Sequence, residues 1–374
     1  MKILAILDTF RPPGYMGNVG GGEISNRILL KGLSRGGHSI RVVTRHGCGA
    51  WRADDLGMQV YDISAVCPVQ VLRKPFALAL YRLMAFRVAK AFTPDVIVSA
   101  TSSIAIAAAV GRRLNTPVGA FVRAFENFDN FDAKPSNFRN LIRDLTRSAA
   151  LGNSRGRAVK QVGFLLPNSQ FIADKCRREF MFPRIHLVYP PLDLSIQPFQ
   201  RKRSIQNICM VGTSPRKGSC VVKQLARRMP HLEFLIIGDP SLSPGQSVSK
   251  DNLTITGWLN ERTSFLTHAD IVLVPSLWEE PFGRVVLEAL AAGKLVLVSN
   301  TGGLPETLAR QELLMVPPGN IDAWQSRLEH AVECPDIYFK ACQAARTRLA
   351  QFSEESQIKA LERALIAEAH HGAK

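Results

Sequence analysis

Residues 279–288 read EEPFGRVVLE, a stretch with two glutamates, Glu280 and Glu288, eight positions apart. The Pro-Phe-Gly turn after Glu280 predicts a helix that begins near Gly283, with Glu288 on the helix and Glu280 in the loop before it. The first N–H groups of a helix lack intrahelical partners, and the helix dipole favours an anion at that end. The two carboxylates are therefore placed to bracket a ligand that carries both phosphate and hydroxyl groups.

Length and composition indicate a globular protein of two domains. The chain has 374 residues, of which 46% are hydrophobic, and at ~100–200 residues per domain two domains are expected. No segment approaches ~20 uncharged apolar residues, and the N-terminal MKILAILDTF is typical of a buried first strand rather than of a signal peptide. The seven cysteines are scattered without a CxxC pair, a pattern that indicates free thiols in a reducing cytoplasm.

The net charge of +16 belongs to the first half of the chain. Residues 1–203 carry 30 Lys and Arg against 13 Asp and Glu, whereas the remainder carries 17 against 18. Such an imbalance indicates either a solvated basic surface or an anionic partner for that half. Nucleic acid is disfavoured as the partner, because the sequence has no zinc-finger spacing, no RRM-like aromatic motif and no heptad-backed basic region.

Two stretches of the basic half are candidates for contact with such a partner. In VLRKPFALALYRLMAFRVAK (71–90) bulky apolar residues are interleaved with basic ones, and Arg139, Arg143 and Arg147 recur at helical spacing further on. One interpretation is ordinary packed helices, each with a solvated face. The other is a surface that contacts anionic lipid or a phosphorylated acceptor.

Two sets of alternating strands and helices follow each other along the chain. The first contains Val- and Ile-rich strands such as SIRVVT (39–44), the glycine loop GYMGNVGGGE (14–23) and a helix from about Ile24 to Ser34. The second begins at QNICMVG (206–212), after a proline-rich, basic stretch. This alternation predicts an α/β protein with two doubly wound parallel sheets, and we expect the ligand in the crevice at the carboxyl ends of the strands, between the domains.

The stretch EEPFGRVVLEALAAGKLVLVSNTGGLPE (279–306) resembles the signature of the GT-B retaining glycosyltransferases of family 4, also called glycosyl transferases group 1. That signature has two glutamates separated by seven residues, a helix of small residues, a strand and a GG-x-PE turn. The segments GGGEISNRILLKGLSRGGHSIRVVT (20–44), LLPNSQFIADKC (165–176) and ADIVLVPSLWEE (269–280) extend the resemblance over nearly the whole chain.

The resemblance implies two Rossmann-like parallel-sheet domains facing a cleft. We expect an acceptor-binding domain at 1–195, a nucleotide-sugar-binding domain at 204–345, and a helical tail at 346–374 that packs back on the first domain. The implied reaction is the transfer of a hexose-type sugar from a UDP- or GDP-linked donor to a glycan or lipid-linked acceptor. It proceeds with retention of configuration and needs neither a metal ion nor another cofactor.

The resemblance also assigns roles to individual residues. Glu288 would hold the ribose hydroxyls, since a carboxylate can accept two bonds from a vicinal diol, and Glu280 would hold hydroxyls of the transferred sugar. Lys217 and Arg216 would neutralise the leaving diphosphate, with Thr213 standing where the family usually carries an arginine. The predicted catalytic residues are Glu280, Lys217 and Arg216. The predicted donor-binding residues are Gly21, Gly22, Gly212, Gly238, Phe282, Gly283, Arg284, Val285 and Glu288.

The first half departs from the family pattern, because no histidine follows the strand in GAFVRAFENFDNFD (119–132). Arg123 and Glu126 are the nearest polar residues and are the predicted contacts to the acceptor or sugar. The sequence has no DxD triplet and no cluster of metal ligands, so no metal site is predicted.

Two other functions are compatible with doubly wound sheets. A nicotinamide enzyme is disfavoured, because the glycine loop lacks GxGxxG spacing and no acidic residue ends the following strand. A catalytically silent glycan- or nucleotide-binding scaffold remains an alternative, because Thr213 and the missing histidine remove two expected contacts. Loops such as TGWLNE (256–261) contribute to the donor pocket without revealing which nucleotide it takes. We expect a cytoplasmic enzyme, peripheral on the inner membrane face, that binds a nucleotide sugar, an acceptor and an anionic membrane surface but no nucleic acid.

Overall fold

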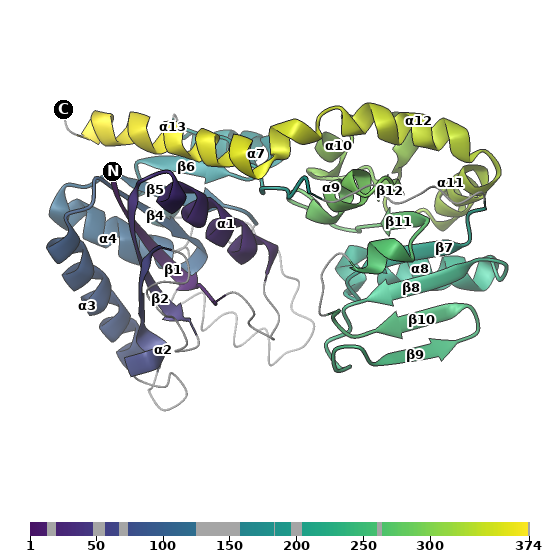
Figure 1. Cartoon of the computed structure of the whole chain (residues 1–374), viewed down its shortest axis with the longest axis horizontal. Coiled ribbons are helices and arrows are strands. Elements are labelled where there is room, and N and C mark those ends of the chain that lie inside the picture. The colour runs from purple at the N-terminus through teal and green to yellow at the C-terminus, as the bar shows by residue number, and fades with distance from the viewer. Residues whose placement is uncertain are drawn as a thin grey trace. The chain divides into compact units, whose positions relative to one another are not determined.

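The computed structural model describes residues 1–12, 20–47, 57–66, 74–124, 158–182, 184–195, 204–259 and 264–372. The chain divides into two compact units, the first made of Met1–Pro191 with Glu354–Lys374 and the second of Leu192–Ser353. Each unit is built on its own sheet with helices packed against it (Figure 1). The predicted α/β class with two doubly wound sheets is thereby confirmed.

The first unit contains a six-stranded sheet in the order β3-β2-β1-β4-β5-β6, with every neighbouring pair parallel. The strands β4, β5 and β6 are buried along their whole length, as expected for parallel strands with helices on both faces. The bounds are β1 (Lys2–Thr9), β2 (Ser39–His46), β3 (Gln59–Asp62), β4 (Val96–Ala100), β5 (Val118–Val122) and β6 (Phe164–Pro167).

The helices described in this unit are α1 (Gly21–Arg35), α2 (Ile63–Val66), α3 (Lys74–Phe92), α4 (Ile104–Leu114), α7 (Gln170–Phe180) and α13 (Glu354–Gly372). The sequence placed the start of α1 near Ile24, which is wrong by three residues. The amides of Glu23 and Ile24 donate to the carbonyl of Gly20 over 3.0 and 3.1 Å, so the last glycines of the predicted loop form the first helical turn. Glu23 favours this start, because an acidic side chain in the first turn complements the helix dipole.

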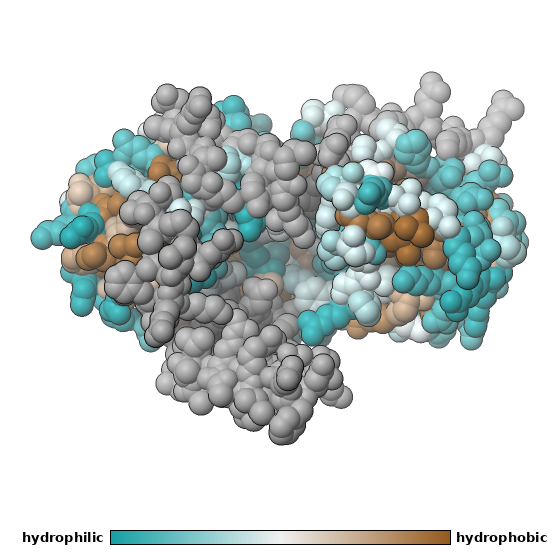
Figure 2. All heavy atoms as spheres, turned by 90° about the horizontal axis from the view of Figure 1, so that it is seen from below, coloured by the Kyte–Doolittle hydropathy of each residue, from teal (hydrophilic) through white to brown (hydrophobic). Residues whose placement is uncertain are grey.

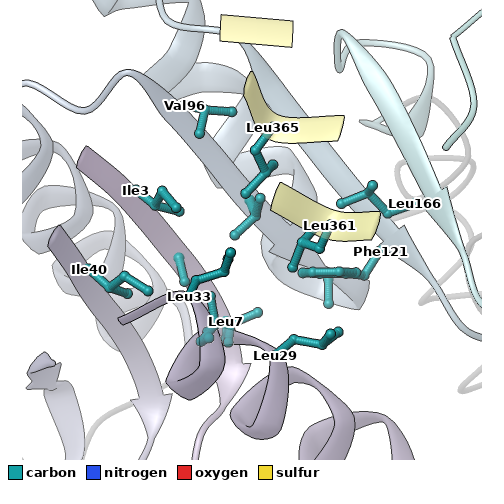
Figure 3. Close-up of a cluster of buried hydrophobic side chains, with 14 of the residues drawn as sticks. Ile3, Leu7, Leu29, Leu33, Ile40, Val96, Phe121, Leu166, Leu361 and Leu365 are labelled. Atoms are coloured by element: carbon teal, nitrogen blue, oxygen red, sulfur yellow. The ribbon is translucent and has the colours of Figure 1, made fainter. Parts of the chain in front are cut away.

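The helix α13 returns from the end of the chain to complete the core of the first unit. Leu361 and Leu365 of α13 are fully buried against Leu29 and Leu33 of α1 and against the face of the sheet that carries Phe121 (Figure 3). Two side-chain hydrogen bonds fix the same helix, one between His38 and Glu362 at 2.7 Å and one between His186 and Glu368 at 2.8 Å. The first unit therefore depends on a segment that follows the whole second unit in sequence.

The second unit contains a seven-stranded sheet in the order β13-β12-β11-β7-β8-β10-β9, in which only β9 is antiparallel to its neighbour. The bounds are β7 (Asn207–Val211), β8 (Glu233–Ile237), β9 (Ser247–Lys250), β10 (Leu253–Thr256), β11 (Ile271–Val274), β12 (Leu295–Ser299) and β13 (Met315–Val316). The strands β3, β9 and β13 lie at sheet edges and were not recognised in the sequence, because none of them has a buried apolar run.

The helices described in the second unit are α8 (Ser219–Arg228), α9 (Arg284–Ala291), α10 (Leu304–Thr307), α11 (Ile321–Glu333) and α12 (Pro335–Arg346). The helix α9 begins directly after Gly283, as the sequence predicts. In the portion of the chain that the structure describes, no helix combines the length and the apolar character needed to cross a bilayer.

Candidate active site

Two glycines at the carboxyl ends of neighbouring strands leave room for side chains above the second sheet. Gly212 follows β7 and Gly238 follows β8, with φ of +101° and +96°. The amide of Gly212 donates to the carbonyl of Ile237 over 2.7 Å, so the two strand ends lie side by side. A Cβ on Gly212 would lie 2.7 Å from Cδ of Lys217, and one on Gly238 would lie 3.0 Å from the indole ring of Trp258. Because glycine has no Cβ, Lys217 can pass over Gly212, and Trp258 can lie against Gly238, at the carboxyl ends of the strands without strain.

The loops after β7 and β11 meet where the strand order of the sheet reverses. The sheet continues from β7 to β8 on one side and from β11 to β12 on the other. The amide of Leu277 donates to the carbonyl of Arg216 over 2.8 Å, and a Cβ on Gly218 would collide with the carbonyl oxygen of Pro275. In doubly wound sheets the ligand crevice lies at this switch point, outside the carboxyl ends of the strands.

Glu280 is held through both its side chain and its backbone. Its Oε2 accepts hydrogen bonds from the Ser276 hydroxyl at 3.2 Å and from the Trp278 indole at 3.0 Å. Its carbonyl accepts the amide of Gly303 at 2.7 Å, and a Cβ on Gly302 would collide with its backbone. Within the described residues, Oε1 of Glu280 accepts no hydrogen bond. The carboxylate is thus oriented on one oxygen and open to a ligand hydroxyl on the other.

Glu288 lies on α9 and is only 4% exposed. Its Oε1 is 3.5 Å from Nε of Arg284, one helical turn earlier. The preceding Gly283 has φ of +99°, and a Cβ there would lie 2.5 Å from Cδ2 of Leu304. The ring of Phe282 is buried against Phe352 with centroids 5.6 Å apart, so Phe282 can offer a ligand only its backbone. The predicted arrangement, with one glutamate before the helix and one on it, is present.

The two predicted cations occupy different positions in the loop after β7. The stem of Lys217 passes over Gly212, and in the described part of the chain its ammonium has no carboxylate partner. Arg216 is exposed, and its carbonyl is bonded to Leu277. The carbonyl of Thr213 accepts the Ser219 hydroxyl over 2.7 Å, which ties the loop to the start of α8. Lys217 therefore lies over the carboxyl end of β7 at Gly212.

The remaining predicted residues belong to the first unit, except Val285, which lies in the first turn of α9. Gly21 and Gly22 form the start of α1, and a Cβ on Gly22 would lie 3.4 Å from Cδ of Arg123. Arg123 follows β5, and its guanidinium carbon is 4.7 Å from the centroid of the Phe121 ring. The three predicted residues are therefore neighbours at the carboxyl edge of the first sheet. Glu126 lies outside the described residues, as do Arg139, Arg143 and Arg147.

Sequence reasoning assigned no role to several residues that shape the site of the second unit. Trp278 and Ser276 orient Glu280, and Trp258 covers Gly238 while remaining 38% exposed. The carboxylate of Asp239, directly after Gly238, accepts hydrogen bonds from the hydroxyl and amide of Ser241, and these bonds lower the pKa of Asp239. The position of Trp258, two residues after the end of β10, is the sequence feature that could have indicated a role at the site. Among the described residues, no group of three His, Cys, Asp or Glu side chains could hold a metal ion.

The architecture matches solved glycosyltransferase structures over almost the whole chain. The crystal structure of Anabaena HepE in complex with UDP-glucose superimposes with a TM-score of 0.74, covering 98% of this chain and 100% of that chain at 14% sequence identity. The fold is thus that of the GT-B glycosyltransferases.

Sequence comparison places the chain within that class. The family model described as Glycosyltransferase Family 4 matches residues 19–196, and the one described as Glycosyl transferases group 1 matches residues 206–333. The chain belongs to this glycosyltransferase family, as its glutamate signature predicts.

Two curated relatives align with parts of this chain. A D-inositol 3-phosphate glycosyltransferase of Mycobacteroides abscessus is 31% identical over 38% of this chain and 37% of the relative. An uncharacterized 42.6 kDa protein in the cps region of Klebsiella pneumoniae is 24% identical over 78% of this chain and 84% of the relative. The chain therefore aligns with little more than a third of the first relative and with most of the second.

Proposed function

We propose that this glycosyltransferase moves a hexose-type sugar from a UDP- or GDP-linked donor to a glycan or lipid-linked acceptor. One observation carries the proposal: Glu280, Glu288 and Lys217 are held by the loops and the helix that follow the strands of the second sheet at its switch point. A nucleotide sugar offers a ribose diol, a diphosphate and sugar hydroxyls, which are the groups that these side chains can bind. The UDP-glucose in the HepE structure of the same fold supports this choice of donor.

Each side chain has a distinct task in the proposed complex. Glu288 accepts hydrogen bonds from the ribose hydroxyls, and its buried position beside Arg284 keeps it oriented. Glu280 accepts from hydroxyls of the transferred sugar through its open Oε1. Lys217, with Arg216 nearby, and the first N–H groups of α9 stabilise the negative charge of the diphosphate.

The proposed reaction retains the anomeric configuration. The bond between the anomeric carbon and the diphosphate oxygen breaks, and the transition state resembles an oxocarbenium ion. The acceptor hydroxyl attacks from the face that the diphosphate leaves, so the new glycosidic bond has the old configuration. The leaving phosphate oxygen takes the hydroxyl proton, and hence no protein nucleophile is required. Lys217 supplies the charge stabilisation, and the proposal includes no metal ion.

We further propose that the acceptor is anionic or lipid-linked and that the enzyme works in the cytoplasm at the inner membrane face. The first half of the chain carries the excess of positive charge, 30 Lys and Arg against 13 Asp and Glu over residues 1–203. The curated relative called D-inositol 3-phosphate glycosyltransferase has a phosphorylated compound in its name, which agrees with this charge.

The test begins with donor binding. The melting temperature of the purified chain is measured with UDP- and GDP-linked hexoses, since a ligand that binds the folded state raises it by mass action. The donor that raises it is then used in transfer and hydrolysis assays with and without EDTA, and the anomeric configuration of the product is read by NMR. Transfer with retention that survives EDTA supports the proposal. Donor binding without transfer or hydrolysis favours the silent nucleotide-binding scaffold. No shift with any donor contradicts both sugar transfer and a nucleotide-binding scaffold.

A further inference from the structure

The helices α3 and α4 of the first unit carry basic residues without acidic ones. Neither helix contains an Asp or a Glu, and their sequences hold six basic residues. These are Lys74, Arg82, Arg87, Lys90, Arg112 and Arg113. On α7 of the same unit, by contrast, Lys175 pairs with Glu179 and Arg177 with Asp174. Within the described residues, none of the five basic side chains from Arg82 to Arg113 forms an ion pair, so their charge is free to attract an anionic partner.

Tyr81 lies on the side of α3 that faces the interior of the unit. It is 1% exposed, and its hydroxyl donates to the carbonyl of Leu7 over 2.8 Å and lies 3.0 Å from the Ser103 hydroxyl. Burial raises the pKa of Tyr81 above its usual value. With Tyr81 pointing inward, the outward side presents Leu78 and Leu83, which are 44% and 45% exposed.

A groove of about 230 Å³ lies between α3 and α4. It is lined by Ala79, Arg82, Leu83 and Phe86 of α3 and by Ala109, Val110 and Arg113 of α4. The guanidinium carbon of Arg113 is 5.6 Å from the centroid of the Phe86 ring, so a cation lies beside the apolar floor. Figure 2 shows hydrophobic residues exposed among hydrophilic ones on this side of the first unit. The surface is thus apolar in its groove and cationic around it.

This combination fits a bilayer better than other occupants. The groove is smaller than the ~300–1,000 Å³ usual for pockets that enclose a small ligand. Exposed leucines would gain nothing from a nucleic acid, whose phosphates need only the cations. Leucine and phenylalanine beside Lys and Arg are the composition of helices that lie in the interface of an anionic membrane. The apolar side chains enter the acyl boundary, and the cations reach the headgroup phosphates.

We propose that α3 and α4 form a docking surface for a bilayer of anionic phospholipids, with Leu83 and Leu78 entering the acyl boundary and Arg82, Arg87 and Arg113 contacting phosphates. The inference deepens the proposed function and rests on it, because a membrane surface matters to this enzyme if its acceptor is presented there. It concerns surface residues of the first unit that take no part in donor binding.

The test is co-sedimentation of the full chain with two kinds of vesicle, phosphatidylcholine alone and phosphatidylcholine mixed with phosphatidylglycerol. Three proteins are compared: wild type, the double variant Arg82→Glu/Arg113→Glu, and the charge-matched control Lys223→Glu/Arg227→Glu on exposed positions of α8 in the second unit. We expect wild type and the control to bind the anionic vesicles at low salt, with salt weakening both. The groove variant should bind at least ~10-fold more weakly. Equal binding by the two double variants, or no preference of wild type for anionic vesicles, would overturn the proposal.

A second variant tests whether the apolar groove enters the bilayer. In Leu83→Trp, the new indole should be quenched by phospholipids brominated on their acyl chains, beyond the quenching of wild type. Equal quenching in Leu83→Trp and wild type would mean that the chain binds the vesicle by charge alone. It would refute the entry of Leu83 into the acyl boundary. The alternative is that a second copy of the chain covers the surface of α3 and α4. Sedimentation velocity without vesicles tests this alternative. If wild type is a dimer and Leu83→Asp dissociates it, the membrane assignment is overturned.

Donor binding separates this inference from the proposed function. The melting temperature of each variant is measured with the donor found for wild type. A chain that binds its donor but no vesicle refutes only the docking surface. A chain that binds anionic vesicles but no nucleotide sugar contradicts the proposed function while leaving the surface intact.

Discussion

The indole Nε1 of Trp278 donates a hydrogen bond to Oε2 of Glu280 over 3.0 Å. Trp278 comes two residues before Glu280, so the loop itself orients the carboxylate that the proposed reaction uses. The backbone of Glu280 is fixed separately by Gly303 at 2.7 Å. A side chain with both ends held in this way loses little further freedom when a ligand binds, which is how a site achieves preorganisation.

Replacing Glu280 with alanine should lower turnover while leaving the affinity for the free nucleotide diphosphate nearly unchanged. The loss of a charged hydrogen bond to the transferred sugar costs ~1.5–3 kcal/mol, about a 10- to 150-fold drop in rate. Initial rates and calorimetric affinities for the diphosphate are measured on the same preparations. The neighbouring, exposed Glu279→Ala is the matched control and should behave as wild type. Similar losses in both variants would mean that the effect is local charge rather than the position of Glu280.

Glu288→Gln should show the opposite pattern, with weaker binding of the nucleotide diphosphate itself. The nucleotide diphosphate contains the ribose but not the transferred sugar. A residue that holds the ribose therefore affects the affinity for the diphosphate. The expected loss is ~1–2 kcal/mol, because the amide keeps one acceptor but loses the charge. The measurement is calorimetric titration with the diphosphate and with the intact donor. Unchanged affinity for both ligands would place the ribose elsewhere.

Lys217→Ala should lower turnover by at least ~10-fold, with Arg216→Ala equal or weaker in effect. The reason is that Lys217 crosses Gly212 at the sheet edge, whereas Arg216 is exposed. Gly212→Ala should reproduce the loss, since its Cβ would lie 2.7 Å from Cδ of Lys217 and its φ of +101° disfavours alanine. Lys223→Ala, on an exposed position of α8, is the control. Full activity of Lys217→Ala in steady-state assays would show that the diphosphate is held by other groups.

Trp258→Ala should weaken binding of the nucleotide, whatever sugar it carries. Trp258 lies against Gly238 at the carboxyl edge of the sheet and is 38% exposed, so a nucleobase can stack on the part of the ring that is open to solvent. Stacking of a base on an aromatic side chain contributes ~1–3 kcal/mol, and Trp258→Phe should recover part of it. The affinities for UDP and GDP are compared with those of Val248→Ala, an exposed apolar residue on β9. Unaltered affinity in Trp258→Ala would show that Trp258 packs against Gly238 without contacting the nucleobase.

Leu361→Ala should destabilise the first unit by ~2–5 kcal/mol, the usual cost of a cavity in a packed core. Leu361 is fully buried, although it lies on the last helix of the chain. Urea unfolding followed by circular dichroism measures the free energy of unfolding. Ile366→Ala on the same helix is the control, because Ile366 is 38% exposed and should cost much less. Equal, small effects of the two substitutions would show that α13 contributes little to the core.

Much of this architecture could be predicted from the sequence. Strands such as β1 and β12 are short runs of Val, Ile and Leu, and this local composition indicates buried parallel strands. The turn before Gly283 placed the start of α9 correctly. The start of α1 was placed three residues too late, because glycine is typical of loops and the stabilising contact of Glu23 with Arg11, 2.6 Å between Oε1 and the Arg11 amide, is not local. The edge strands β3, β9 and β13 were missed because a sheet edge does not require an apolar run.

The sequence by itself determined the fold class, the family and the residues that form the glutamate signature, because these depend on spacing and composition within short segments. Only the tertiary structure decided that Lys217 passes over Gly212, that Trp278 and Gly303 hold Glu280, and that Leu361 belongs to the core of the first unit. Contacts of this kind depend on strand register and on backbone angles such as the positive φ of Gly212. Strand register and backbone angles are set by packing between segments far apart in the chain. A local pattern of residues therefore cannot predict them.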